Sequence, residues 1–71
     1  MRVAVVKAAY DDEACVWYVE HSDVVGLRVE GETFETFRRN VADAATDLIE
    51  GDGEFHIEII AHASVRARAP A

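Results

Sequence analysis

One stretch of the chain reads Ala14-Cys15-Val16-Trp17-Tyr18-Val19, then Asp23-Val24-Val25-Gly26, then Gly31-Glu32-Thr33. Its first part is rich in Val, Trp and Tyr, the residue types that favour strands. Its second part has the Asp and Gly of a turn, and Thr33 is a good helix N-cap. The stretch therefore predicts a strand, a turn, a short strand and the start of a helix.

Strands are predicted on both sides of a polar turn at residues 11–13. Residues 3–10 are dominated by Val and Ala on both alternating faces, which is typical of a central strand. Residues 15–21 follow the turn and predict the second strand of a hairpin. Residues 27–30 then alternate between apolar and polar side chains, which indicates a short edge strand.

A helix is predicted from residue 34 to residue 50. Thr33 is its N-cap, and residues 51–53 end it, because glycine is common after the last helical turn. Glu35 is spaced to pair with Arg39 on the solvent side. An apolar stripe at helical spacing, expected to cover the core, comprises Phe34, Phe37, Val41, Ala44, Ala45, Leu48 and Ile49.

Residues 55–64 alternate between apolar and polar side chains and predict a long last strand. The order of elements is then β-β-β-α-β, an α+β fold. A right-handed crossover makes the last strand parallel to the first, which gives a four-stranded mixed sheet in the order 3-2-1-4. We expect a single domain over residues 1–66 and a flexible tail over residues 67–71. The side chains of the last strand expected to face the helix are Phe55, Ile57, Ile59, Ala61 and Ala63.

One helix covers one face of such a sheet. The reverse face then presents apolar side chains to solvent, and surfaces of this kind mark association sites. A second copy of the chain is the expected cover, because a domain of 71 residues buries a modest fraction of its surface and gains stability by self-association. The predicted interface residues are Val16, Tyr18, Ile60 and His62.

The composition is acidic, with a formal net charge of −7 at pH 7. This charge repels phosphate backbones, so we expect a basic protein as partner rather than direct binding to nucleic acid. The single cysteine excludes an internal disulfide and fits a reducing compartment. No apolar run approaches membrane-spanning length, and Lys7 interrupts the N-terminal segment too early for a signal peptide. We therefore expect a cytoplasmic protein.

The acidic side chains raise an alternative function, a metal-dependent nuclease. Asp11, Asp12, Glu13 and Asp23 carry the oxygen ligands that divalent cations prefer. A two-metal nuclease of the ribonuclease H type needs an acid inside the first strand, and residues 3–9 contain none. Acidic turns are common where the chain is solvated, so we favour solvated turns and predict no catalytic residue.

The histidines and the cysteine predict no metal or cofactor site. His56 and His62 are six strand residues apart, roughly 20 Å at about 3.3 Å per residue, which is too far for one metal ion. Cys15 and His21 have the same spacing. Cys15 is expected to pack in the core beside Trp17, because no base is placed next to it. A sensor domain that binds a small ligand at a dimer seam stays open as a third function.

Several short motifs together resemble the HicB-like antitoxin family over residues 3–60, with the greatest similarity to its short members. The motifs are a second strand with Trp17, Ser22-Asp23-Val24-Val25-Gly26-Leu27, Gly31-Glu32-Thr33, and Asn40-Val41-Ala42-Asp43-Ala44. In that family the domain resembles a truncated ribonuclease H fold. Its classical members bind and block a basic toxin, HicA, that cleaves messenger RNA.

The resemblance implies a non-enzymatic protein-binding module that forms homo-oligomers and has a HicA-like basic toxin as partner. Classical members also add a C-terminal DNA-binding segment, which has no counterpart here, and Val25 stands where a proline is common. The resemblance assigns a role in fold maintenance to Trp17, Gly26, Leu27, Thr33 and Ala44, and it supplies no catalytic residue.

Overall fold

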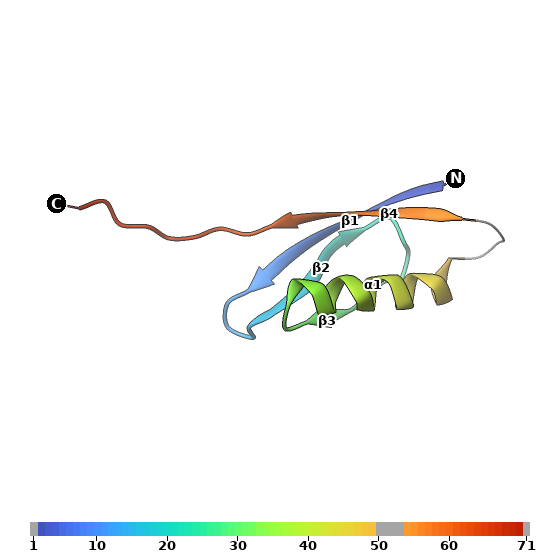
Figure 1. Ribbon diagram of the computed structural model, residues 1–71, viewed down its shortest axis with the longest axis horizontal. Helices are drawn as coiled ribbons and strands as arrows, with labels where there is room; N and C mark the ends of the chain where they lie inside the picture. The colour runs from blue at the N-terminus through green and yellow to red at the C-terminus, as the bar shows by residue number, and fades with distance from the viewer. Residues whose placement is uncertain (1, 50–53, 71) are drawn as a thin grey trace.

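The computed structural model describes residues 2–49 and 54–70, which form one sheet with a helix on one side (Figure 1). The elements are β1 (Arg2–Asp11), β2 (Val16–Ser22), β3 (Glu30–Gly31), α1 (Phe34–Leu48) and β4 (Phe55–His62). The strands lie in the order β3-β2-β1-β4. The predicted α+β fold and the sheet order 3-2-1-4 are therefore confirmed.

β1 is a central strand with a neighbour on each side. β2 runs antiparallel to it and β4 runs parallel to it, with α1 in the crossover that a parallel pair requires. The pairing with β2 is irregular, because Lys7 lies opposite His21 whereas Ala8 lies opposite Val19. Glu20 is the extra residue between these pairs and forms a β-bulge.

The helix begins after Thr33, which is the predicted N-cap. The Thr33 hydroxyl oxygen accepts a hydrogen bond from the backbone N–H of Thr36 at 3.0 Å and so satisfies one of the free donors of the first turn. The helix ends at Leu48, and the backbone N–H of Ile49 donates to the carbonyl oxygen of Ala45 at 2.9 Å. The predicted end at residue 50 and the glycine stop at residues 51–53 lie outside the described residues.

The hydrophobic core lies between α1 and the sheet face that β1 and β2 turn toward it. Its buried centre comprises Val6, Ala8, Val24, Leu27, Phe37 and Val41. A row of aromatic rings continues from this centre to the end of β1 and β2 next to their turn. Trp17 lies edge to face with Tyr10 at 5.4 Å and with Phe34 at 5.2 Å between ring centroids, an arrangement that aromatic pairs prefer.

The prediction that Cys15 packs in the core is wrong. Cys15 is exposed and has a φ of 57°, the left-handed conformation found in turns. Its backbone N–H donates to the carbonyl oxygen of Asp11 at 2.7 Å and closes the turn between β1 and β2. β2 consequently begins at Val16, and the thiol points away from the core.

The third strand lies further along the chain than residues 27–30. β3 consists of Glu30 and Gly31 alone and pairs with β2. Leu27 is 4% exposed, and its backbone N–H donates to the carbonyl oxygen of Val24 at 3.2 Å. The segment before β3 is therefore a turn whose buried side chains belong to the core. Its apolar and polar residues alternate as they do in a strand, which is why the sequence predicted one there.

The last strand ends at His62 rather than at residue 64. The backbone of α1 approaches β3 and β2 most closely. Phe55, Ile57 and Ile59 are half-buried beside the core, whereas Ala61 and Ala63 are exposed. The prediction that these side chains face the helix is confirmed for Phe55, Ile57, Ile59 and Ala61, since Ala61 pairs with the buried Ala8 although it is itself exposed, whereas Ala63 lies beyond the end of the strand.

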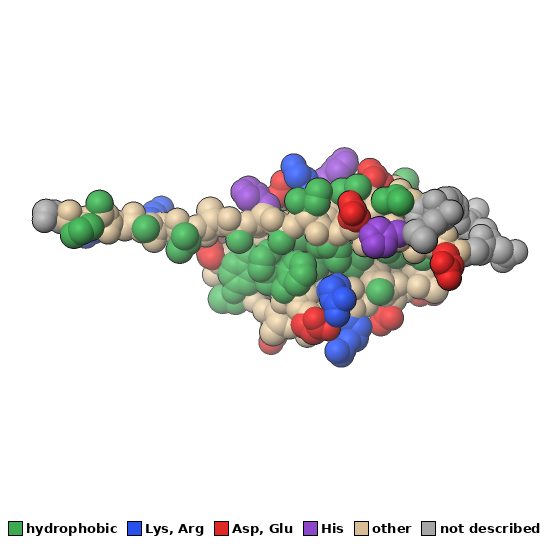
Figure 2. Space-filling model, turned by 45° about the horizontal axis from the view of Figure 1, so that its top comes forward, with side chains coloured by type: hydrophobic (Ala, Val, Ile, Leu, Met, Phe, Trp, Pro, Cys, Tyr) green, Lys and Arg blue, Asp and Glu red, His purple; other side chains and the backbone are tan. Residues whose placement is uncertain are grey.

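Residues 63–70, here termed the C-terminal arm, continue from β4 as an extended, fully exposed segment. The arm stands clear of the body in Figures 1 and 2. It accounts for the elongated shape of the chain, with extents of 58 × 21 × 18 Å. The predicted division between domain and tail at residue 66 falls within it and stays a prediction.

Candidate interaction surfaces

The face of the sheet opposite α1 is here termed the open face. Side chains point alternately to the two faces of a strand, so every second residue of β1, β2 and β4 belongs to it. The register aligns these residues in rows that cross the strands. The open face is formed by Val3, Val5, Lys7 and Ala9 of β1, by Val16 and Tyr18 of β2, and by His56, Glu58, Ile60 and His62 of β4.

Two of the predicted interface residues flank Ala9 from opposite sides. Tyr18 pairs with Ala9 from β2, and His62 pairs with Ala9 from β4. Because the Ala9 side chain is small, side chains from the outer strands can reach one another across it. Glu20 does so from the bulge, and its Oε2 lies 3.7 Å from Nδ1 of His62. The alternation of the sequence gives no signal for the bulge, and the role of Glu20 was therefore not predicted.

The other two predicted interface residues also lie on the open face. Val16 pairs with Asp11 at one end of β2, and Ile60 pairs with Lys7 in the middle of the sheet. Ile60 is 50% exposed and Val3 is 62% exposed. Charged side chains alternate with these apolar ones, so the open face is amphipathic rather than uniformly apolar.

A second surface is a groove between α1 and β4. It has a volume of about 460 Å³ and is lined by Phe34, Arg38, Val41, Ala42, Thr46, Phe55, Ile57 and Ile59. Figure 2 shows hydrophobic side chains gathered between the helix and the strand that carries the C-terminal arm. The groove was not predicted, although strand spacing indicates it. Four strands about 4.8 Å apart are wider than one helix of about 10 Å, so a helix near β2 and β3 leaves β4 partly uncovered.

The side chain of Asp11 in the acidic turn, residues 11–13, accepts hydrogen bonds from the backbone of the turn. Oδ1 of Asp11 accepts hydrogen bonds from the backbone N–H of Glu13 at 2.9 Å and of Ala14 at 3.3 Å. The sulfur of Cys15 donates to the carbonyl oxygen of Asp12 at 3.5 Å. Asp11 therefore caps the turn through its own carboxylate, as aspartate commonly does after a strand.

Asp23 also holds the backbone in place. Its Oδ2 accepts a hydrogen bond from the N–H of Val5 at 2.9 Å, and its own N–H donates to the carbonyl oxygen of Val5 at 3.0 Å. These two bonds join the end of β2 to β1. Among residues 2–49 and 54–70, the structure brings no three His, Cys, Asp or Glu side chains together as a set of metal ligands.

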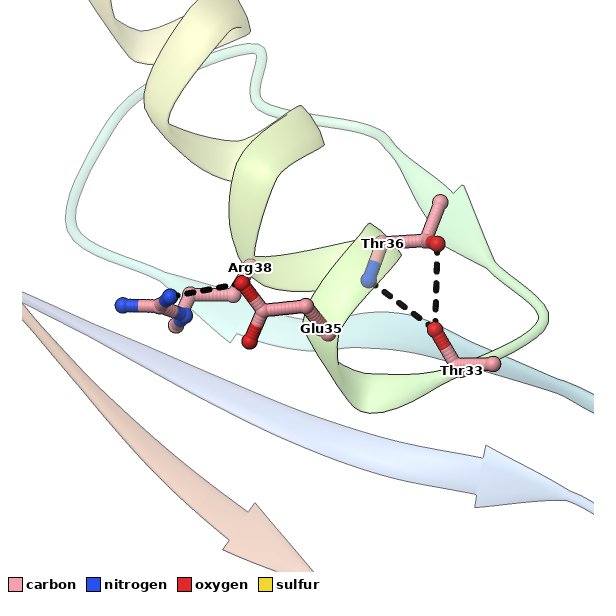
Figure 3. A network of polar contacts seen from close by, with 4 residues as sticks. All are labelled: Thr33, Glu35, Thr36 and Arg38. Atoms are coloured by element: carbon pink, nitrogen blue, oxygen red, sulfur yellow. Dashed lines mark hydrogen bonds and ion pairs between the residues drawn. The ribbon is translucent and has the colours of Figure 1, made fainter.

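Figure 3 shows the polar contacts of the first helical turn. Arg38 donates to Oε1 of Glu35 at 2.7 Å, so the pair is formed with Arg38 and the predicted partner Arg39 was wrong. The hydrogen bond and the positive charge of Arg38 lower the pKa of Glu35, and the same contact raises the pKa of Arg38. Both side chains are exposed, which makes this a solvated ion pair on the helix surface.

Tyr10 lies where β1 enters the turn. Partial burial is the main cause that raises the pKa of Tyr10, followed by the neighbouring Cys15 thiol and the charges of Asp12 and Asp11. A phenol with a raised pKa stays neutral at pH 7 and suits the aromatic contact with Trp17.

Comparison with known proteins places this geometry in a family. The sequence profile of a family described as "Domain of unknown function (DUF1902)" matches residues 3–69. The chain belongs to this family. The crystal structure of a hypothetical protein, TTHA1013 from the extremely thermophilic bacterium Thermus thermophilus, is similar with a TM-score of 0.68 and 32% sequence identity. The similarity covers 96% of this chain and 100% of that chain.

A comparison with curated proteins finds no match. Within the described residues, no helix is both long enough and apolar enough to cross a membrane.

Proposed function

We propose that this chain is a non-enzymatic protein-binding module of the HicB type. In this proposal it forms homo-oligomers in the cytoplasm and neutralises a basic, mRNA-cleaving, HicA-like toxin by direct contact. The observation that carries the proposal is the open face, where exposed apolar side chains alternate with charged ones. The sequence prediction assigned this face to a second copy of the chain, and the present proposal assigns it to the toxin. The likeness to a truncated ribonuclease H fold belongs to the same proposal.

The charge of the chain supports a basic partner. Seven Lys and Arg stand against 14 Asp and Glu. Complementary charge accelerates the encounter of two proteins and disfavours wrong partners, while the buried apolar contacts supply most of the affinity. In this proposal, the negative electrostatic potential of the chain favours a basic partner. The apolar side chains of the open face then supply most of the binding energy.

The open face offers side chains suited to such contacts. Tyr18 and Ile60 are 37% and 50% exposed, so each has apolar area left to bury. Tyrosine is enriched among the residues that dominate binding energies at interfaces. Glu20 and His62 lie beside them and supply a polar rim. The contact proposed here centres on this group.

The rival function, a metal-dependent nuclease, would use Asp11, Asp12, Glu13 and Asp23. The carboxylates of Asp11 and Asp23 accept backbone hydrogen bonds instead, at the turn and at the end of β2. The backbone contacts of these two of the four candidates support the binding module over the nuclease, because a carboxylate that accepts backbone hydrogen bonds has fewer oxygen lone pairs for a metal ion.

The proposal requires that an adjoining gene encodes a short basic protein, and the experiment that tests it is a calorimetric titration with that protein. We expect a 1:1 complex of the protomers and a Tyr18→Ala variant whose dissociation constant rises at least about tenfold, as for loss of an interface anchor. Val25→Ala is the matched control, because Val25 is 90% exposed and lies off the open face. Absence of binding, or an equal effect of both variants, would contradict the proposal.

A parallel assay separates the nuclease. The purified chain is incubated with RNA and magnesium or manganese, and cleavage is measured with and without Asp11→Asn. The binding module predicts no turnover in either sample. Turnover that Asp11→Asn abolishes would establish the nuclease in its place.

A further inference from the structure

β4 lies at the edge of the sheet. It pairs with β1 on one side, and within the described residues no strand pairs with its other side. An edge of this kind presents a row of free N–H and C=O groups and is a template for another strand. Proteins protect such edges with Lys, Pro or bulges, and residues 55–62 contain no Lys and no Pro and pair with β1 in unbroken register.

The C-terminal arm has the pattern of a strand that lacks a neighbour. Val65, Ala67 and Ala69 alternate with Arg66 and Arg68, which is the period of a strand with two different faces. All of the arm's described residues are exposed, and Val65 is 88% exposed. An isolated extended segment is not stable in water, so an arm with this pattern needs a partner strand.

Charge indicates where the arm binds. The arm contains two arginines and no acidic residue, whereas the rest of the chain has five basic and 14 acidic residues, a net charge of −9. β4 carries Glu58 on the open face and the apolar Phe55, Ile57 and Ile59 on the helix side. Its two faces therefore match the two faces of the arm.

The arm cannot reach the free edge of its own β4, because it continues β4 in the same direction. We infer that the C-terminal arm of one copy pairs antiparallel with the free edge of β4 in a second copy, and that the exchange is reciprocal. This inference rests on the homo-oligomeric part of the proposed function and names the contact that forms the dimer.

The register of this pairing follows from faces and charge. A two-fold axis perpendicular to the sheet places residues of the same face opposite each other. With the axis at His62, Arg66 lies opposite the partner's Glu58, Val65 opposite the partner's Ile59, and Ala67 opposite the partner's Ile57. Pairing then covers residues 55–69 and stops before Pro70, which has no N–H to donate.

Shifting the register by two residues in either direction is less favourable. One shift places Ser64 opposite the partner's Glu58 and Arg66 opposite the partner's His56, and its one arginine–glutamate pair, Arg68 with the partner's Glu54, lies before β4 begins. The other brings Arg68 to the partner's Glu58, but it places Arg66 opposite the partner's Ile60 and draws Pro70 into the ladder. Both open faces lie on the same side of the resulting sheet, which leaves Tyr18 free for a toxin. The toxin contact centres on Tyr18 of β2, whereas the dimer contact centres on β4 and the arm, and the two contacts adjoin at His62.

Cysteine cross-linking tests the register. In a Cys15→Ala background, His62→Cys places two thiols opposite each other at about 5 Å between Cβ atoms, within reach of a disulfide. We expect a covalent dimer of most of the protein under mild oxidation. Ser64→Cys is the matched control, because its two copies lie four residues, about 13 Å, apart along the strands and should stay uncoupled. Equal coupling of both variants, or none of His62→Cys, overturns the register.

Exchanging the charges of Arg66 and Glu58 tests the ion pair proposed between the arm and the partner's β4. The dimer dissociation constant is measured by sedimentation velocity at low salt. Arg66→Glu and Glu58→Arg each turn two symmetric ion pairs into like-charge pairs, and each should raise the dimer dissociation constant about tenfold. The double variant should restore the wild-type constant. Arg28→Glu makes the same charge change on an exposed residue outside the arm and β4, and it should leave the constant unchanged.

The outcomes distinguish this inference from the proposed function. A stable dimer that neither the cross-link nor the charge exchange affects overturns the arm exchange and leaves the homo-oligomer intact. A monomer at about 200 µM overturns both the arm exchange and the homo-oligomeric part of the proposal. The toxin titration is unaffected by either result, because it reports on Tyr18 of the open face.

Discussion

Gly31 lies against the first turn of the helix, where β3 passes beneath it. A Cβ atom added at Gly31 would lie 2.6 Å from Cα of Phe37 and 2.9 Å from its Cβ. Phe37 is itself fully buried, so the helix cannot move away without opening the core. Glycine at this position permits the close approach of β3 and α1.

We therefore expect Gly31→Ala to lower the free energy of unfolding by about 2–3 kcal/mol, as overpacked sites do. Gly26→Ala is the control, since Gly26 has a φ of 84° and open space around it, with Leu48 Cδ2 at 3.8 Å. Its cost is backbone strain of about 1 kcal/mol. Urea unfolding measures both, and a Gly31→Ala variant no less stable than Gly26→Ala would contradict the packing described here.

Single residues also mark the limit of prediction from sequence. Thr33 was predictable as an N-cap because its role depends on a contact three residues away. Cys15 was not, because its alternation with Trp17 fits a strand and its left-handed φ depends on the turn that Asp11 closes. The bulge at Glu20 likewise depends on pairing with β1, which local sequence does not encode.

At the level of the elements, α1 carries a pH-dependent contact. Arg38 lowers the pKa of Glu35 in the folded chain. The pair therefore stabilises the fold above the unfolded pKa of about 4.3, and the contribution is lost as the pH falls through the lower, folded value. Glu35 also lies in the first helical turn, where a negative charge is favourable.

Glu35→Gln should accordingly be less stable than the wild type near neutral pH, and the difference should vanish as the pH is lowered toward about 2. Urea midpoints across this range measure the effect. Glu32→Gln removes the same charge before the helix and serves as the control. A deficit of Glu35→Gln that persists unchanged in acid would show that the ion pair is not its cause.

The positions of the elements were predictable in part. The helix start and the two long strands follow from hydrophobic periodicity, which is a local property. The third strand was predicted too early in the chain, at residues 27–30. Val24 and Leu27 are apolar because they are buried in the core from a turn, and they do not belong to a strand. The groove beside β4 was not predicted. The apolar stripe of the helix shows that one side of the helix packs on a sheet, but it does not show which strands lie under the helix.

At the level of the whole molecule, the sheet order could be predicted because few topologies satisfy short connections and a right-handed crossover. The four proposed interface residues follow from this order, since alternation assigns Val16, Tyr18, Ile60 and His62 to one face once the register is known. The amphipathic character of that face emerged from the structure, in which Lys7 and Glu58 lie between the apolar side chains.

In the proposed function, this chain acts by binding a basic protein through the open face. NMR chemical-shift mapping of the chain tests this, with the short basic protein that the proposal requires an adjoining gene to encode. We expect perturbations at Tyr18, Ile60 and His62, with the acidic turn at Asp11 and Asp12 unchanged. Perturbations confined to that turn, or none anywhere on the open face, would contradict it.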